Sequence, residues 1–515
     1  MKPEDELLGA IEDRKIALRS HRAWQAAASR LYPLLQTVAE FRAGEIDAGI
    51  VSDVPWETLF DLVIRWHHEF PVGEGECDRE TAFEVLTFAL EFSRLEQLEY
   101  SVRVGAYAVR RRGNNFRVRH RWNAAREAAD LYLEASARPK RILEITETEK
   151  RWANARPASS RRIPPVEVLK ASADRAKNSI DAWREALPEG HLSDSFMLGD
   201  GLTLRDAKSL LAGIMGLASL CELAARSKSR LEPTLAHLGR QEMIDCLSGL
   251  CPDVSTEQIE DMLERLTYRP GRPARTSPLI EYDGKLVLCP PLITARAIDV
   301  IALRTAAHDA SRFGRVGQNL RKRADAWATW LSNIPGVKVL ERVKVRRIDG
   351  KPAGDLDVIA IDPTDGLGLC FEIKLPIDAV MRREVEKIED WVKSAANQLD
   401  RIRAELASGG AVAKTPKEWP SLGDLDMAWG VGAPQQLSLT PVGVEDMFSV
   451  SLRYLLAAGE PTSLRSLVEL LRCPDLPLRG LHFSEESLVY EVGRRKLLVD
   501  AVRLREFGWR PRFTQ

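Results

Sequence analysis

The sequence predicts an α+β protein. A large, mostly α-helical N-terminal region with a small β-hairpin precedes a core of alternating helices and strands, and a small C-terminal extension follows. Three observations carry this prediction. Apolar residues recur at three- and four-residue spacing over most of the first 265 residues, as in helices that bury one face. Residues 101–122 alternate around a turn, and strand-like segments cluster between residues 337 and 374.

The composition is that of an ordinary soluble globular protein. Of 515 residues, 44% are apolar, and 74 Lys and Arg nearly balance 75 Asp and Glu, so only local charge can indicate a polyanionic partner. Seven cysteines without a Cys-x-x-Cys pair favour a reducing compartment over disulfides or a zinc ribbon. The acidic start MKPEDELLG lacks the apolar segment of a signal peptide, and the most apolar uncharged run, residues 209–221, is too short to span a bilayer. We therefore expect a cytoplasmic protein without a membrane segment.

The first half divides into three parts. Residues 1–100 are predicted to be helical, and residues 101–122 to form a basic β-hairpin with its turn at Gly113, Asn114 and Asn115. Residues 123–267 return to helical periodicity and offer no catalytic motif. This helical bulk could recognise a target, form a homodimer or dock a partner protein, and the residues do not choose among these roles.

The second half begins with residues 268–310, which are predicted to hold a linker, a hairpin and a connecting helix. The linker is the Pro- and Arg-rich stretch 268–278, and the hairpin turns at Asp283 and Gly284. Next come a helix over 317–334, three strand-like segments that end near Lys374, and an amphipathic helix over 382–406. Residues 456–515 are expected to be a small α+β extension.

Charges stand inside two of these apolar strands. In GDLDVIAI, Asp355 and Asp357 are expected on one face, with Leu356, Val358 and Ala360 on the other; in CFEIK, Glu372 and Lys374 share a face. Paired strands then bring two carboxylates and an amine to one spot. Clustered carboxylates repel each other unless a cation lies between them, and oxygen ligands suit Mg²⁺ or Mn²⁺. Such an ion can polarise a phosphate oxygen and activate water.

An aspartate followed, on the adjacent strand, by the chain's one Glu-x-Lys resembles the PD-(D/E)xK superfamily of restriction-endonuclease-like and nuclease-related domains. The resemblance covers residues 311–455 and implies a nuclease domain with an αβββαβ core. It implies that Asp357 and Glu372 bind the metal and that Lys374 is catalytic. It also implies roles for Gln398 beside the site and for Asp325 as a metal ligand on the first helix, where the family more often has glutamate. Asp355 departs from the family's usual glutamate, so either Asp355 or Asp357 could be the main ligand.

Two basic clusters are candidate contacts for nucleic acid. Eight arginines and no acid lie between residues 103 and 126, with Tyr107, Phe116, His120 and Trp122 interleaved, so phosphate contact and base stacking are both expected. The alternative is a solvated face that pairs with acidic helices of the same chain. The candidate residues are Arg110, Arg111, Arg112, Arg117, Arg119 and Arg121 in the hairpin, and Arg315, Arg321, Lys322 and Arg323 before the charged strands.

These features lead to a ranked set of hypotheses. The first is a metal-dependent nuclease, a DNA endonuclease of the bacterial restriction or anti-phage defence type, with a homodimer expected by analogy. The second is a catalytically inactive nuclease-fold protein that binds nucleic acid or a partner protein. The third is a structural scaffold with an ordinary charged sheet. No phosphate-binding P-loop is present in the sequence, which argues against nucleotide-driven translocation.

Overall fold

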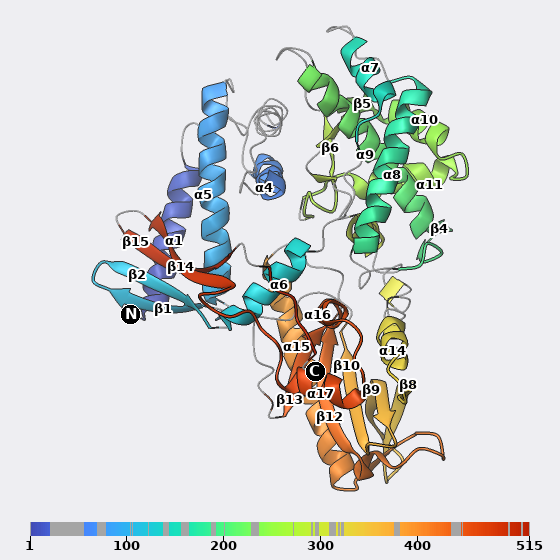
Figure 1. Ribbon diagram of the computed structural model, residues 1–515. Helices are drawn as coiled ribbons and strands as arrows, with labels where there is room; N and C mark the ends of the chain where they lie inside the picture. Colours follow the sequence, from blue (N-terminus) through green and yellow to red (C-terminus); the bar gives the residue numbers. More distant parts are fainter. Residues whose placement is uncertain are drawn as a thin grey trace.

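The computed structural model is a mixed α+β protein, as the sequence predicts (Figure 1). Its described residues are 2–20, 35, 56–69, 79–103, 105, 107–121, 123–136, 144–155, 164–186, 192–199, 201–227, 236–270, 272–289, 292–293, 298–307, 316–317, 320, 324–374, 382–433, 444, 446–492, 495–505 and 508–513.

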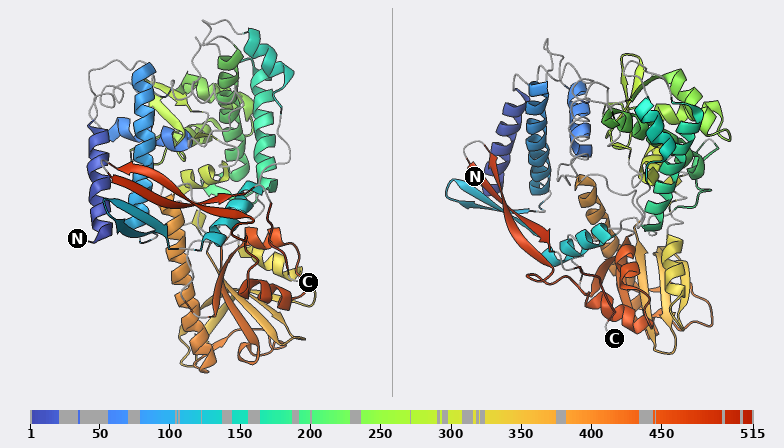
Figure 2. Two further views of the ribbon diagram at one scale, coloured as in Figure 1. Left: turned by 60° about the vertical axis from the view of Figure 1, so that its left-hand side comes forward. Right: turned by 45° about the horizontal axis from the view of Figure 1, so that its top comes forward.

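A four-stranded sheet joins the predicted basic hairpin to the C-terminal part of the chain. The hairpin forms as predicted, with Gly113 at a φ of 62° in its turn. The hairpin of β14 and β15 adds to it in the order β1-β2-β15-β14, with β15 parallel to β2 (Figure 2). Segments 101–122 and 456–515, expected as separate parts, therefore share one sheet. Its apolar face packs on helices through Phe92, Val118 and Leu497. The elements are α1 (Pro3–Arg19), α4 (Trp56–Glu69), α5 (Arg79–Arg103), β1 (Tyr107–Arg112), β2 (Asn115–His120), β14 (Phe483–Val492) and β15 (Arg495–Leu504).

A second part is largely helical and has its own core. Helices α8 and α9 approach closely at Gly216, where a Cβ would lie only 2.8 Å from the Ala173 nitrogen, so a larger residue would not fit. Ser172 of α8 also donates a hydrogen bond to the Gly216 carbonyl of α9 at 2.9 Å. The elements are α7 (Glu147–Ala155), α8 (Val166–Ala186), β3 (Met197–Gly199), β4 (Leu202–Thr203), α9 (Leu204–Ser227), β5 (Ala236–Gly239), α10 (Arg240–Leu250), α11 (Thr256–Leu266), β6 (Leu279–Tyr282), β7 (Lys285–Leu288) and α12 (Ile298–Ala307).

The described residues of 268–278, expected as a linker, are packed against the first part. Tyr268 and Ala274 are buried, and the Ala274 amide donates to the carboxylate of Asp61 on α4 at 2.5 Å. The hairpin that follows is confirmed: Asp283 and Gly284 both have positive φ, 50° and 67°, as a type I′ turn between β6 and β7 requires.

A third part contains the charged strands. Its six-stranded sheet has the order β11-β8-β9-β10-β12-β13, in which β8, β9 and β10 are antiparallel neighbours and β10, β12 and β13 are parallel. Helix α15 covers one face through Val392, Leu399 and Ile402, while α14, α16 and α17 cover the other. The elements are α14 (Ala324–Ser332), β8 (Lys338–Arg347), β9 (Pro352–Asp362), β10 (Leu367–Ile373), α15 (Arg382–Ala407), β11 (Ala411–Ala413), the 3₁₀ helix η5 (Leu422–Asp424), β12 (Asp426–Ala433), β13 (Met447–Ser451), α16 (Leu452–Ala458) and α17 (Leu464–Arg472).

Glycines on β12 allow this packing. A Cβ on Gly432 would lie 2.7 Å from the Trp327 ring of α14, and one on Gly430 would lie 2.0 Å from the Phe448 ring of β13. Trp327 also contacts Phe371, with ring centroids 4.9 Å apart. The sequence GVG on β12 therefore accommodates aromatic rings beside the strand that carries Glu372. Helix α6 (Ala124–Ser136) packs on the same side of the sheet, through Tyr132 and Leu133.

One described helix, α9, is long and apolar enough to cross a membrane. Its most apolar stretch, Leu204–Ala224, is 72% buried inside the protein. Such burial is expected of the core helix of a soluble protein. The described cysteines are free thiols, and Cys473 is the exposed one among them.

Candidate functional site

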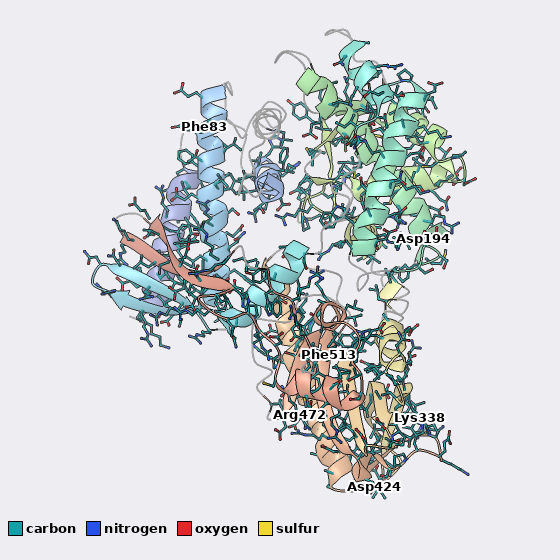
Figure 3. The ribbon with its side chains drawn as sticks, in the orientation of Figure 1. Phe83, Asp194, Lys338, Asp424, Arg472 and Phe513 are labelled. Carbon is teal, nitrogen blue, oxygen red and sulfur yellow. The ribbon has the colours of Figure 1, made fainter. Side chains whose placement is uncertain are left out.

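The site lies where strands β9 and β10 separate. Their last backbone pair is Val358 with Phe371. One residue further, the side chain of Asp357 accepts a hydrogen bond from the Ile373 amide at 2.7 Å through Oδ2. A carboxylate therefore replaces a backbone carbonyl at the end of the ladder, which fixes Asp357 beside Glu372. Figure 3 labels Lys338, at the start of β8, and Asp424 of η5 on the part of the molecule that contains this sheet.

The alternation of β9 is interrupted at Asp357. Leu356 packs in the core with Ile402 of α15, whereas Val358 and Ala360 pack in the other core with Trp327 of α14. The prediction that Leu356, Val358 and Ala360 share a face was therefore wrong. The interruption lies opposite an irregular residue of the neighbouring strand β8. This residue is Arg342, which has a positive φ of 56° and lies between the paired residues Glu341–Val358 and Val343–Leu356.

Glu372 is a buried carboxylate. Glu372 is only 5% exposed, and its Oε1 forms an ion pair with Lys374 Nζ at 2.8 Å. Among the described residues, Oε2 of Glu372 has no hydrogen-bond partner. Burial raises the pKa of Glu372, the charge of Asp357 raises it further, and the hydrogen bond from Lys374 opposes both. Complete burial, and after it the charges of Glu372 and Asp357, hold the pKa of Cys370 well above its ordinary value.

Lys374 is held at the end of β10 by its own backbone. Its amide donates to the Gly432 carbonyl of β12 at 2.8 Å, and its side chain is 28% exposed. The ammonium therefore connects the buried carboxylate to solvent.

Asp355 and Gln398 line a groove of about 550 Å³ next to this pair, formed by β8, β9 and α15. Lys344 Nζ pairs with Asp355 Oδ2 at 2.6 Å, and both side chains are more than half exposed. Lys344 and Arg346 also line the groove. Sequence reasoning missed these two cations; the signal that could have found them is their alternation in VKVRR.

Asp325 lies in the first turn of helix α14, beside strand β8. Its Oδ1 lies 3.6 Å from Arg342 Nη2. It also lies next to Glu341, whose pKa is raised mainly by burial and further by the charge of Asp325. The charges that act on Glu372 are those of Asp357, Lys374 and Asp355. The structure thus brings Asp355, Asp357, Glu372 and Lys374 together and groups Asp325 with Glu341.

The hairpin arginines divide between two faces. Arg111 contacts Glu6 of α1 at 3.2 Å, whereas Arg117 and Arg119 contact Asp500 of β15 at 3.6 and 3.5 Å. Arg110 and Arg112 lie on the exposed face, and Arg121, directly after β2, is exposed. Arg315, Arg321, Lys322, Arg323, Trp122 and the side chain of His120 lie outside the described residues.

The residues present suit a small hard cation with few protein ligands. Over the part of the chain that the structure describes, no group of three or more His, Cys, Asp or Glu side chains could hold a metal ion. Asp357 and Glu372 supply two carboxylates, and the unpartnered Oε2 of Glu372 is an available ligand atom. Mg²⁺ commonly binds through one or two carboxylates and keeps several waters, so two ligands are sufficient for it.

No family model, curated protein or solved structure matches the chain. Its function is therefore argued from these residues.

Proposed function

We propose that this chain is a metal-dependent nuclease that hydrolyses phosphodiester bonds in DNA. The observation that carries the proposal is Glu372: a buried carboxylate faces Asp357, contacts Lys374 at 2.8 Å and keeps one oxygen without a partner among the described residues. Burial of a carboxylate beside a second one is costly unless a cation joins them. The order α14, β8, β9, β10, α15, β12, interrupted by the short edge strand β11 and by η5, supports the same proposal, since the resembling nuclease domains have an αβββαβ core.

Each residue has a distinct part in the proposed reaction. Asp357 and Glu372 would hold Mg²⁺ or Mn²⁺, which supplies phosphate polarisation and a lower pKa for bound water. Lys374 favours the ionised form of Glu372 and can donate a hydrogen bond to a phosphate oxygen as negative charge develops there. Gln398 and Asp355 lie on the adjacent groove, where an amide and a carboxylate can orient water. Lys344 and Arg346 offer positive charge to the flanking phosphates.

A restriction or anti-phage defence role in the cytoplasm follows from the resemblance alone and belongs to the proposal, as do a homodimer and a protein partner for the helical N-terminal region. A second candidate function is binding without cleavage. It is favoured by the small number of acids at Lys374: among the described residues Glu372 is the acid that contacts its ammonium, whereas Asp325 contacts Arg342 and lies beside Glu341.

Plasmid cleavage in Mg²⁺ or Mn²⁺ tests the proposal. We expect wild type to cut and Glu372→Gln and Lys374→Ala to lose activity by about 100-fold or more. Matched controls come from the same part of the molecule: Glu405→Gln removes a carboxylate that pairs with Arg347 on the surface, and Lys338→Ala removes an exposed lysine of β8. Equal activity in all five proteins would reject the site. Metal-independent DNA retardation without cutting would favour the binding function.

A further inference from the structure

Four arginines of the first hairpin share one exposed face of the four-stranded sheet. Arg110 lies directly opposite Arg117, and Arg112 and Arg119 continue the same face on the two strands. The other face of the hairpin is buried through Val109, Phe116 and Val118. We call Arg110, Arg112, Arg117 and Arg119 the arginine face.

The charges of the arginine face are only partly compensated. Like charges directly opposite each other on antiparallel strands are destabilising. Asp500 of β15 is the acid that contacts Arg117 and Arg119, and its distances of 3.6 and 3.5 Å leave both pairs loose. Within the described part of the chain, Arg110 and Arg112 make no ion pair. The sheet thus maintains a positive surface at a cost in stability. The positive surface does not extend to the β14 edge of the sheet, because there Glu491 lies directly opposite Lys496 and offsets its charge.

Aromatic rings do not accompany these arginines in the described hairpin. Phe116 is only 1% exposed, and Tyr107 lies on the helix-facing side, where it lines a cavity of about 610 Å³ with Leu90 and Leu98 of α5. Proteins that hold single strands stack bases on aromatic side chains, and none of the described residues of the hairpin offers such a ring on the arginine face. Guanidinium groups without rings suit the phosphates of a duplex, which has about one charge per 1.7 Å of axis.

We propose that the arginine face binds the phosphate backbone of double-stranded DNA, and that Asp500 competes with the phosphates for Arg117 and Arg119. The inference rests on the proposed function for the choice of a nucleic-acid partner, but it requires no cleavage. Duplex binding here would be independent of sequence and would weaken with salt, because each contact releases counterions from the DNA.

The test is fluorescence anisotropy with a labelled DNA duplex of about 25 base pairs, in EDTA so that no cleavage occurs. The variants are Arg110→Ala/Arg117→Ala and Asp500→Asn. The matched control is Arg503→Ala. Arg503 is a 73% exposed arginine of the same strand, β15, but its side chain lies on the opposite face of the sheet from Asp500 and pairs with Glu486. Thermal unfolding of each protein shows that it is folded.

We expect the double variant to bind at least about tenfold more weakly and to lose roughly 1.8 from the magnitude of the salt slope, 0.9 for each phosphate contact. Asp500→Asn should bind roughly two- to fivefold more tightly, and Arg503→Ala as wild type. Unchanged binding in the double variant, weaker binding in Asp500→Asn, preference for a single strand, or equal affinity for anionic lipid vesicles would each overturn the inference. Loss of duplex binding by the double variant in EDTA supports it even if wild type never cuts DNA.

Discussion

Asp357 Oδ2 accepts a hydrogen bond from the Ile373 amide at 2.7 Å, so a carboxylate closes the β9–β10 ladder at the point where Glu372 turns into the core. At this position a side chain, rather than a backbone carbonyl, accepts the hydrogen bond that holds the two acids together. This contact also connects the fold to the proposed chemistry, because any change that lengthens it separates the two carboxylates.

The first prediction concerns pH. Burial and Asp357 raise the pKa of Glu372, so between the ordinary glutamate range and that raised value the folded protein binds a proton that the unfolded chain has lost. Stability from this group is therefore greatest at low pH and falls as pH rises through that window. Glu372→Gln cannot ionise, and its free energy of unfolding should exceed that of wild type by about 1 kcal/mol at pH 8, with no difference near pH 4.

Urea unfolding at the two pH values checks this prediction. Glu405→Gln is the control with the opposite sign, because Arg347 lowers the pKa of Glu405 and its ionised form stabilises the fold. A Glu372→Gln protein less stable than wild type at pH 8 would contradict a desolvated, unfavourably placed carboxylate.

The second prediction concerns the metal. An ion that binds only the folded state stabilises it, so Mg²⁺ should raise the free energy of unfolding of wild type by about 1–3 kcal/mol when its concentration far exceeds the dissociation constant. Asp357→Asn and Glu372→Gln should lose this gain. Asp325→Asn should keep it, because Asp325 lies with Glu341 and Arg342. Thermal shift with and without Mg²⁺ at matched ionic strength measures the effect, and its loss in Asp325→Asn would place that aspartate in the site.

The third prediction concerns Lys374. Lys374→Met removes the hydrogen bond that opposes the raised pKa of Glu372, so that pKa rises further and the free energy of unfolding at pH 8 falls by about 1–3 kcal/mol. Lys374→Arg should restore most of the stability but not full cleavage, since a planar guanidinium does not replace an ammonium point charge. Unfolding curves and cleavage rates on the same preparations separate the two effects. Equal stability of Lys374→Met and wild type would mean that the ion pair is immaterial.

The fourth prediction concerns Gly432. A Cβ at this position would meet the rigid, fully buried Trp327 ring at 2.7 Å, so Gly432→Ala should destabilise the sheet by roughly 1–3 kcal/mol. Urea unfolding measures the loss, which arises because the Trp327 ring must move to admit the Cβ. Trp327→Leu should reduce the penalty in a double-mutant cycle. Additive effects of the two substitutions would show that the ring is not the obstacle.

The sequence predicted what depends on local chemistry. The turn at Gly113, the I′ turn at Asp283 and Gly284, and the helix from Arg382 were confirmed because turn residues and apolar spacing act over a few residues. It also indicated Glu372 and Lys374 from their place inside an apolar strand. The interrupted alternation of side chains on β9 at Asp357 was not predictable, since it accompanies the positive φ of Arg342 on another strand. Asp325 was assigned from its position on a helix, and only the fold shows that it lies beside Glu341.

Because Val118 of β2 pairs with Val499 of β15, the four-stranded sheet can be completed only near the end of synthesis of the chain. About 380 residues separate the partners, so at 5–20 residues per second the first hairpin leaves the ribosome roughly 20–80 s before its neighbouring strand exists. Through that interval Val118 and Phe116 lie on an unfinished sheet edge that can pair with other chains. A stop codon between the end of α17 and the start of β15 would make that exposure permanent, and the truncated product should aggregate or be degraded even though its helices are complete.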